Sequence, residues 1–416
     1  MKKFFYYSAL ILACAVSCDK VGQEGVTPED PAENTPSAPV ELRLSPQQKQ
    51  VAAAISEGNV PFLGDLMDDY PGVDIVYSPY SLSLALSMLS LGAGGQTKED
   101  ILTFLGLKDF EEDDITGLYG ALTGVIDKID PDCTLTSSNS HWYAKDFPIK
   151  ETFKQKSVRY FSAELFEGKD FSLDKTREEM NAWCAEKTKG LIQNMFETNP
   201  AEAIAILINA LYFKGGWTDP MERDDTKRNF YHSNGTASEE TEWITHTSSF
   251  PYFESESASV LSIPFGNGAF SFVIALPKEG VNIRDYVGGK AAEDCRASNS
   301  ALKLVSLTVP VLEAEFKNDI TLTLVKNGLL SLMLDADFSG MSDNALVVSK
   351  IVQASKLKID EKGGEAAAVT VIEVEAADPG PDVTPISPIP FTADRPFLYG
   401  IRENESSMFL FLGVKQ

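Results

Sequence analysis

Histidine and cysteine are scarce in this chain of 416 residues. None of the histidines has metal-ligand spacing, and we expect all of them to be free on the surface. They are His141, His232 and His246. Beyond the N-terminal segment the cysteines form an odd set at irregular spacing, which predicts buried thiols and no disulfide framework. They are Cys133, Cys184 and Cys295.

Basic residues are also in the minority. Lys and Arg total 36 against 61 Asp and Glu, which gives a formal net charge of −25. This balance argues against nucleic acid or an anionic membrane surface as a partner, because both would repel the chain. Hydrophobic residues make up 43% of the chain and aromatic residues 10%, which indicates a soluble globular protein with ample core material.

Motifs for catalysis are missing or misplaced. The sequence contains no phosphate-binding loop and no G-x-S-x-G elbow. Three short matches to a penicillin-recognising serine enzyme occur, at residues 172–175 (S-x-x-K), 342–344 (S-D-N) and 187–190 (K-T-K-G). The last two stand in the wrong order, and K-T-K-G falls in a helical pattern where a strand is required. We therefore expect that the protein is not an enzyme.

The chain starts with a targeting segment. Residues 1–3 are basic at two positions, and residues 4–16 are apolar apart from Ser8, a run too short to span a bilayer. Residues 15–18 resemble a bacterial lipobox, so we expect a lipoprotein signal peptide over residues 1–18 with Cys18 as the lipidated residue. Cys14 is the competing site, and a plain secretory signal is the alternative. Residues 19–40 predict a flexible tether. The expected location is the outer membrane of a bacterial cell envelope, facing the periplasm or the exterior, with membrane contact only through the lipid.

No second linker or repeat divides residues 41–416, and we expect one large domain there. From Leu42 onward the pattern is helical. Residues 78–93 predict a buried helix with Ser78 as its N-cap and Pro79 in its first turn. Residues 203–217 form a near-continuous apolar run, typical of a central strand covered on both faces. Within that run, Asn209 is a buried amide that must find hydrogen-bond partners.

The most informative stretch is residues 352–397. Residues 356–360 alternate as a half-buried strand, and Gly363-Gly364 follows. From residue 364 to 375 the even positions are small or apolar, whereas the odd positions carry all the charge, so the even face can be buried in a sheet. The stretch then ends in residues 378–382, D-P-G-P-D, which are typical of an exposed loop tip. This segment has the residue pattern of a central strand but ends like an exposed loop, so we expect it to adopt two conformational states.

Residues 360–370, D-E-K-G-G-E-A-A-A-V-T, resemble the reactive-loop hinge of serpins, and residues 391–397 resemble the strand that follows that loop. Further matches occur in family order at residues 181–192, 203–217, 261–265, 272–277, 307–310, 337–341 and 408–414. The resemblance covers about residues 42–416. It implies an α+β serpin fold, a single large domain with a large mixed sheet, smaller sheets, surrounding helices and an exposed reactive loop at about 361–391.

The resemblance also implies site residues. The hinge would comprise Glu361, Gly363, Gly364, Glu365, Ala366, Ala367, Ala368 and Thr370. The gate of the sheet, where strands part to admit the loop, would comprise Ser78, Ser81, Asn209 and Trp217. Three features depart from the family pattern. Gly364 stands where Thr or Ser is usual, Gln353 stands where many members have His, and the loop is several residues longer.

The implied function is suicide inhibition of a serine or cysteine endopeptidase. The protease would cut the loop and be trapped as an acyl-enzyme when the hinge half inserts into the sheet. The partner is then a covalently bound protease, the inhibitor is a monomer, and no cofactor is implied. The alternative is a non-inhibitory binding protein or a protease substrate. Such members often carry charge or proline on the inserting face, whereas this face has none from Gly364 to Val374.

In the family the cleaved bond usually lies about 16 residues beyond the hinge glutamate. Counting from Glu361 gives Ala377–Asp378, with Ala376 as the next candidate. The neighbouring residues include no Arg, Lys or aromatic side chain, which favours an elastase-like or subtilisin-like target over a trypsin-like one. Counting back from Phe391 instead places the bond near residues 385–386, where prolines would resist most proteases.

Overall fold

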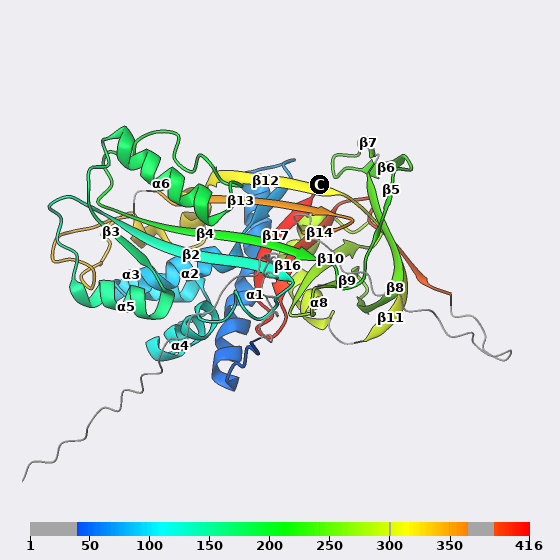
Figure 1. The fold of residues 1–416 in the computed structure, drawn as a ribbon, viewed down its shortest axis with the longest axis horizontal. Coiled ribbons are helices and arrows are strands. Elements are labelled where there is room, and N and C mark those ends of the chain that lie inside the picture. Colours follow the sequence, from blue (N-terminus) through cyan, green and yellow to red (C-terminus); the bar gives the residue numbers. More distant parts are fainter. Residues whose placement is uncertain (1–39, 241, 299–300, 349, 365–386) are drawn as a thin grey trace, which may run out of the picture. The chain divides into compact units, whose positions relative to one another are not determined.

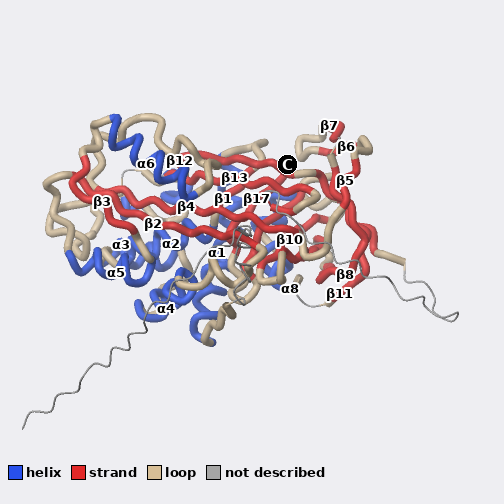
Figure 2. Tube along the Cα trace, in the orientation of Figure 1, coloured by secondary structure: helices blue, strands red, loops and turns tan. Residues whose placement is uncertain are grey.

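The computed structural model describes residues 40–364, with gaps at 241, 299–300 and 349, and residues 387–416. Residues 38–416 cluster as one compact unit. Helices and strands are mixed along the chain, as expected for an α+β fold (Figures 1 and 2). Within the described residues no helix is long and apolar enough to cross a membrane.

Two helix starts follow directly from the sequence. Ser45 caps α1 by accepting a hydrogen bond from the backbone N–H of Gln48, and Ser78 caps α2 in the same way through Ser81. Pro79 occupies the first turn of α2, so the predicted start of this helix is confirmed. The helices are α1 (Pro46–Asp69), α2 (Pro79–Ser90), α3 (Gly95–Phe104), α4 (Glu112–Thr123), α5 (Glu151–Phe161), α6 (Asp174–Lys187), α7 (Ile283–Gly288), α8 (Ala291–Ala297), α9 (Thr321–Lys326) and the short 3₁₀ helix η1 (Leu330–Leu332).

The described strands form two large sheets and a hairpin. The first sheet has the order β12 (Leu312–Asp319), β13 (Val352–Asp360), β14 (Gly363–Gly364), β4 (Ala205–Gly216), β2 (Cys133–Ala144), β3 (Glu164–Lys169). The second has the order β1 (Ile75–Tyr77), β17 (Phe409–Lys415), β16 (Phe397–Glu403), β10 (Phe270–Pro277), β9 (Ala258–Phe265), β8 (Trp243–Glu254), β11 (Leu302–Pro310), β15 (Ile389–Thr392), with β5 (Glu222–Asp224) beside β8. The hairpin pairs β6 (Arg228–Tyr231) with β7 (Ala237–Glu240).

Helices cover both faces of the first sheet. On one face α6 packs over β2 and β4, where Trp142, Met180 and Ile208 belong to one apolar cluster (Figure 1). On the other face α2 packs against β4 and also against β17 of the second sheet. The strand β4 is therefore covered on both sides, as its continuous apolar sequence predicted.

The cysteine prediction is confirmed and the histidine prediction is wrong. Cys133, Cys184 and Cys295 are free and buried. His141 is fully buried between β2, α2 and α5, where its ring nitrogens contact the Tyr143 hydroxyl at 2.8 Å and the Met88 sulfur at 3.4 Å. The two others are also engaged, because His232 and His246 each hydrogen-bond a neighbouring residue. The sequence around a single histidine in a strand does not show which face of the sheet its side chain occupies, so the burial of His141 could not be predicted.

Candidate functional site

The two-residue strand β14 lies between β13 and β4 and pairs antiparallel with both. Gly363 pairs with Asp360 of β13 and with Gly216 of β4, and Gly364 pairs with Ile359 and with Gly215. Both glycines are buried. The chain therefore turns back after β13 and immediately enters the sheet on the edge of β4. Among the described residues, β14 is the only strand that joins β13 to β4.

Glycine is required at the first of these positions. Gly363 has a φ of +125°, and a Cβ atom there would lie 2.1 Å from the carbonyl oxygen of Gly215. At Gly364 a Cβ atom would stand 3.3 Å from the ring of Phe213, which is tight but can be relieved by a small shift. A larger residue at 364 must therefore press on Phe213, whereas at 363 even alanine would displace the backbone.

Trp217 fixes the turn that leads into β14. Its indole N–H donates to the carbonyl oxygen of Asp360 at 3.0 Å, and its ring stacks on Phe265 with centroids 4.5 Å apart and planes 9° apart. Within the turn, the backbone N–H of Lys362 donates to the Asp360 carboxylate at 2.9 Å. The turn is thus held by the Trp217 side chain, which follows β4, and by a hydrogen bond between two residues of the turn itself.

The hinge glutamate has a cationic neighbour that the sequence did not indicate. The carboxylate of Glu361 lies 3.7 Å from a guanidinium nitrogen of Arg223 on β5, and the Glu361 side chain is only 20% exposed. Arg223 also contacts Asp225 and Glu242, so it serves several carboxylates at once. Because these partners are far apart in sequence, no local motif could have revealed the contact.

The predicted gate residues fall into separate groups. The side-chain amide of Asn209 on β4 donates to the amide oxygen of Asn139 on β2 at 2.7 Å, and Asn139 donates to the carbonyl of Phe161 at 2.7 Å. Ser78 donates to Ser81 at 2.8 Å at the start of α2. In the described part of the chain no hydrogen bond joins the two serines to Asn209, although α2 packs against β4. Asn139 was not among the predicted gate residues, although it holds the Asn209 amide.

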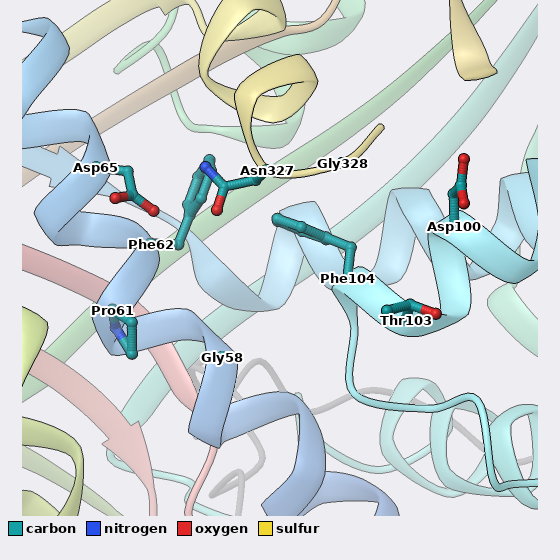
Figure 3. A pocket seen from close by; sticks show the side chains of 9 residues that line it. All are labelled: Gly58, Pro61, Phe62, Asp65, Asp100, Thr103, Phe104, Asn327 and Gly328. Carbon is teal, nitrogen blue, oxygen red and sulfur yellow. The ribbon is translucent and has the colours of Figure 1, made fainter. Parts of the chain in front are cut away.

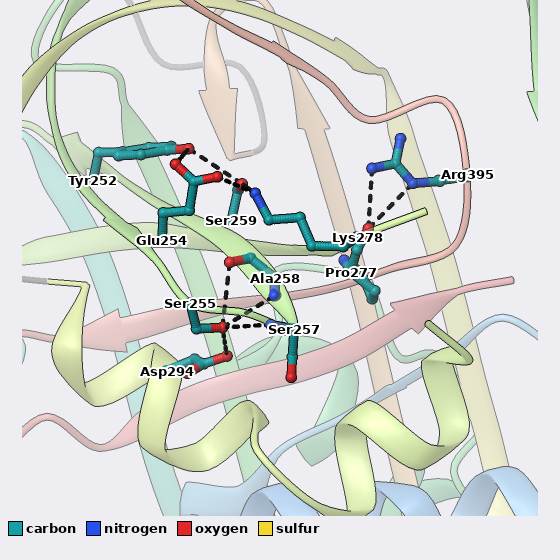
Figure 4. Close-up of polar contacts among 10 residues, drawn as sticks. All are labelled: Tyr252, Glu254, Ser255, Ser257, Ala258, Ser259, Pro277, Lys278, Asp294 and Arg395. Carbon is teal, nitrogen blue, oxygen red and sulfur yellow. Dashed lines mark hydrogen bonds and ion pairs between the residues drawn. The ribbon is translucent and has the colours of Figure 1, made fainter. Parts of the chain in front are cut away.

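The far end of the loop is also anchored to the body. β15 pairs parallel with β11 over Ile389–Thr392, and the N–H of Ala393 donates to the carbonyl of Thr308 at 2.9 Å. Two N–H groups of Arg395 donate to the carbonyl of Pro277 at the end of β10, at 3.1 and 3.0 Å (Figure 4). The segment that begins at residue 387 is thus tied to two strands of the second sheet.

Other predicted site residues lie outside the described residues. These are Glu365, Ala366, Ala367, Ala368 and Thr370 of the hinge, Ala376, Ala377 and Asp378 of the predicted bond, and Cys18. Within the residues that are described, no group of His, Cys, Asp and Glu side chains has a metal-binding arrangement.

Comparison with known proteins gives one consistent family. Residues 60–415 match the family model of the serpins, described as serine protease inhibitors. The chain is 30% identical over 384 residues to the leukocyte elastase inhibitor of Bos taurus, covering 88% of this chain and 98% of the relative.

Solved structures agree with this assignment. The native state of tengpin, a thermophilic serpin, superposes with a TM-score of 0.77 at 25% identity, covering 91% of this chain and 96% of tengpin. Human thyroxine-binding globulin superposes with a TM-score of 0.77 at 24% identity, covering 88% of this chain and 98% of that one, which shows the shared fold. The family match spans most of the chain and includes β14, the strand that pairs with both β13 and β4. The chain therefore belongs to the serpin family.

Proposed function

We propose that this serpin is a suicide inhibitor of serine or cysteine endopeptidases that works by loop cleavage and insertion between β4 and β13. The observation that carries the proposal is the position of β14, since its two glycines already pair with both strands. A loop continuing from Gly364 along the same path would become a new central strand of the sheet.

The register of β14 predicts which loop residues would meet which strand residues. Continued without a shift, residues 365–374 would lie beside residues 214–205 of β4, which is the rest of that strand. Even-numbered loop residues would then share the face of Gly364, where Phe213 and Ile359 are buried. This is the face that the alternation of small and apolar residues predicts to be inserted.

Charged and polar residues fit the same register. Glu365 would lie between Lys214 on β4 and Lys358 on β13, on the opposite face, so that two ammonium groups would flank one carboxylate. Thr370 would lie between Asn209 and Gln353. The side-chain oxygen of Asn209 is buried and has no hydrogen-bond partner among the described residues. The Thr370 hydroxyl could supply the missing donor.

Insertion on this path would be strongly favourable. Roughly ten new backbone hydrogen bonds at about 1 kcal/mol net each give a driving force on the order of 10 kcal/mol. Burying the side chains of Ile372 and Val374 would add about 1.5–3 kcal/mol apiece. A protease attached to the cut end would be carried along, and this free energy would be available to distort its active site.

We further propose cleavage at Ala377–Asp378, with Ala376 as the next candidate, by an elastase-like or subtilisin-like protease. Small apolar side chains suit the shallow specificity pockets of these enzymes, and the neighbourhood offers no Arg or Lys for an anionic pocket. The relative named leukocyte elastase inhibitor supports this class of target.

Incubation with a panel of serine and cysteine proteases tests the proposal, with denaturing gels and mass spectrometry as the readout. We expect a covalent complex that survives denaturation, together with a released C-terminal fragment that begins at Asp378. Rapid cleavage without any complex would identify a non-inhibitory member. A fragment that begins beyond Val383 would contradict both the bond and the class of target.

A further inference from the structure

A cavity of about 370 Å³ lies between α1, α3 and the turn that follows α9, away from the hinge (Figure 3). The residues that line it are Gly58, Pro61, Phe62, Asp65, Asp100, Thr103, Phe104, Asn327 and Gly328. Nothing in the loop mechanism uses this cavity, and its lining has a composition that points to a ligand.

The middle of the cavity is apolar. The rings of Phe62 on α1 and Phe104 on α3 meet edge to face, with centroids 5.4 Å apart and planes 89° apart. Pro61 adds an apolar wall beside them (Figure 3). Such a surface favours an aliphatic chain, and the faces of aromatic rings also attract cations.

The polar groups around the rings are mostly hydrogen-bond acceptors. The carboxylates of Asp65 and Asp100 contribute negative charge, and no Lys or Arg lines the cavity. The side-chain N–H of Asn327 is engaged with the carbonyl of Thr323, which leaves its amide oxygen as an acceptor. Because Pro61 has no N–H, the carbonyl of Glu57 one turn earlier lacks the usual helical donor. A ligand for this lining must therefore donate hydrogen bonds and carry positive charge.

The two carboxylates stand on different helices, one helical turn from the rings. Asp65 follows Phe62 on α1, and Asp100 precedes Phe104 on α3, so that in Figure 3 they lie on opposite sides of the ring pair.

Neither carboxylate is fully compensated by its neighbours. Arg284 is bidentate with Asp68 and reaches Asp65 only at 3.6 Å. Asp100 accepts hydrogen bonds from Gln96 and Ser331, both neutral groups. Each carboxylate therefore retains acceptor capacity for a cation.

From this arrangement we infer that the cavity binds a linear aliphatic diamine, with one ammonium group at Asp65, the other at Asp100, and the hydrocarbon chain across Phe62 and Phe104. A monoamine can satisfy only one of the two carboxylates, and a neutral chain satisfies neither. The strong negative charge of the whole chain would raise the local concentration of such a dication.

Isothermal titration of the full chain with 1,8-diaminooctane tests the inference, with octylamine and 1,8-octanediol as matched ligands. We expect the diamine to bind about fivefold more tightly than octylamine, since the second ion pair is partly exposed. Asp65→Asn and Asp100→Asn should each weaken diamine binding about fivefold. Each should also bring the diamine close to the monoamine in affinity.

Asp113→Asn on α4 serves as the control, because it removes the same charge at an exposed position outside the cavity. It should leave diamine binding unchanged. Three results would overturn the inference: undetectable diamine binding, equal affinities for diamine and monoamine, or an equal loss in Asp113→Asn. The last result would mean that the diamine is attracted only by the net charge.

Discussion

At the scale of single residues, Ala367 and Ala368 are neighbours that the register of β14 assigns to opposite faces of the sheet. Continued pairing would place Ala368 beside Leu211 and Ser355, both buried. It would place Ala367 on the other face, between buried Tyr212 and partly exposed Lys356. The same substitution at the two alanines therefore tests the face assignment with little change in loop composition.

Ala368→Glu should abolish trapping while the loop is still cut, because insertion would bury an unpaired carboxylate at a cost of several kcal/mol. Ala367→Glu should keep trapping, since its carboxylate could pair with Lys356. The stoichiometry of inhibition against one susceptible protease measures both effects. If the two variants trap equally well, the even face is not the buried one.

His141 makes stability depend on pH. Burial lowers the pKa of His141 to about 3, whereas the unfolded side chain titrates near 6.5. Between these values the unfolded chain binds a proton that the folded chain does not, so the free energy of unfolding falls as pH decreases below about 6.5. From about pH 7 to about pH 5 this group should remove up to about 2 kcal/mol.

His141→Leu should flatten that pH dependence, whatever it does to stability at neutral pH. Urea midpoints of the variant and the parent at about pH 7 and about pH 5 measure the difference in slope. Parallel losses in the two proteins would show that other groups control the acid sensitivity.

At the scale of elements, β15 and Arg395 hold the C-terminal end of the loop. An uncut loop could insert fully only if β15 left β11, because its two ends are otherwise held in different sheets. Arg395→Leu removes the donors to the Pro277 carbonyl and should weaken this anchor by about 1–2 kcal/mol. The variant should therefore lose inhibitory activity roughly 5- to 30-fold faster on storage at a fixed temperature.

Arg296→Leu is a suitable control for this measurement. Arg296 on α8 is an exposed cation paired with exposed Glu57 on α1, outside β14 and β15, and such pairs contribute little. Storage stability equal to that of the parent is expected for it. If Arg395→Leu also stores like the parent, the strand pairing of β15 alone holds the loop.

Elements with strong local signals could be predicted from the sequence. The apolar run of β4 is enough by itself to predict a covered strand, and Ser78-Pro79 is enough by itself to predict the start of α2. At Gly363-Gly364 the structure has a turn after Asp360 that leads into a strand with two neighbours. That outcome depends on β4, which is remote in sequence.

Several contacts of the candidate site could not be predicted either, because they also join residues that are remote in sequence. Arg223 reaches Glu361 and Arg395 reaches Pro277 only after folding. Asn139 pairs with Asn209 through strand pairing that links residues about seventy positions apart in sequence. Local patterns of polarity identify strands and caps, but they do not identify the partners of an exposed-looking side chain.

At the scale of the whole molecule, the N-terminal segment predicts attachment to a membrane through lipid. If Cys18 carries the acyl chains, Cys18→Ala should release the protein from the membrane fraction into the soluble fraction, because the lipid on this residue is the expected membrane anchor. Fractionation of cells followed by immunoblotting measures this. Cys14→Ala is the matched control and should remain with the membrane. Acyl chains found on Cys14 by mass spectrometry would refute the assignment.

The residue pairs that Gly363 and Gly364 already form in the sheet affect the rate of loop insertion. A strand that starts from an existing pair needs no search for a partner, so the loop can lengthen it residue by residue as soon as its far end is released. Trapping of the protease then depends on two rates, the rate of hydrolysis of the acyl bond and the rate of insertion of the strand. With the cut proposed at Ala377–Asp378, the stretch that must insert has the usual length, because the additional residues of this loop lie beyond the cut and add no step to insertion.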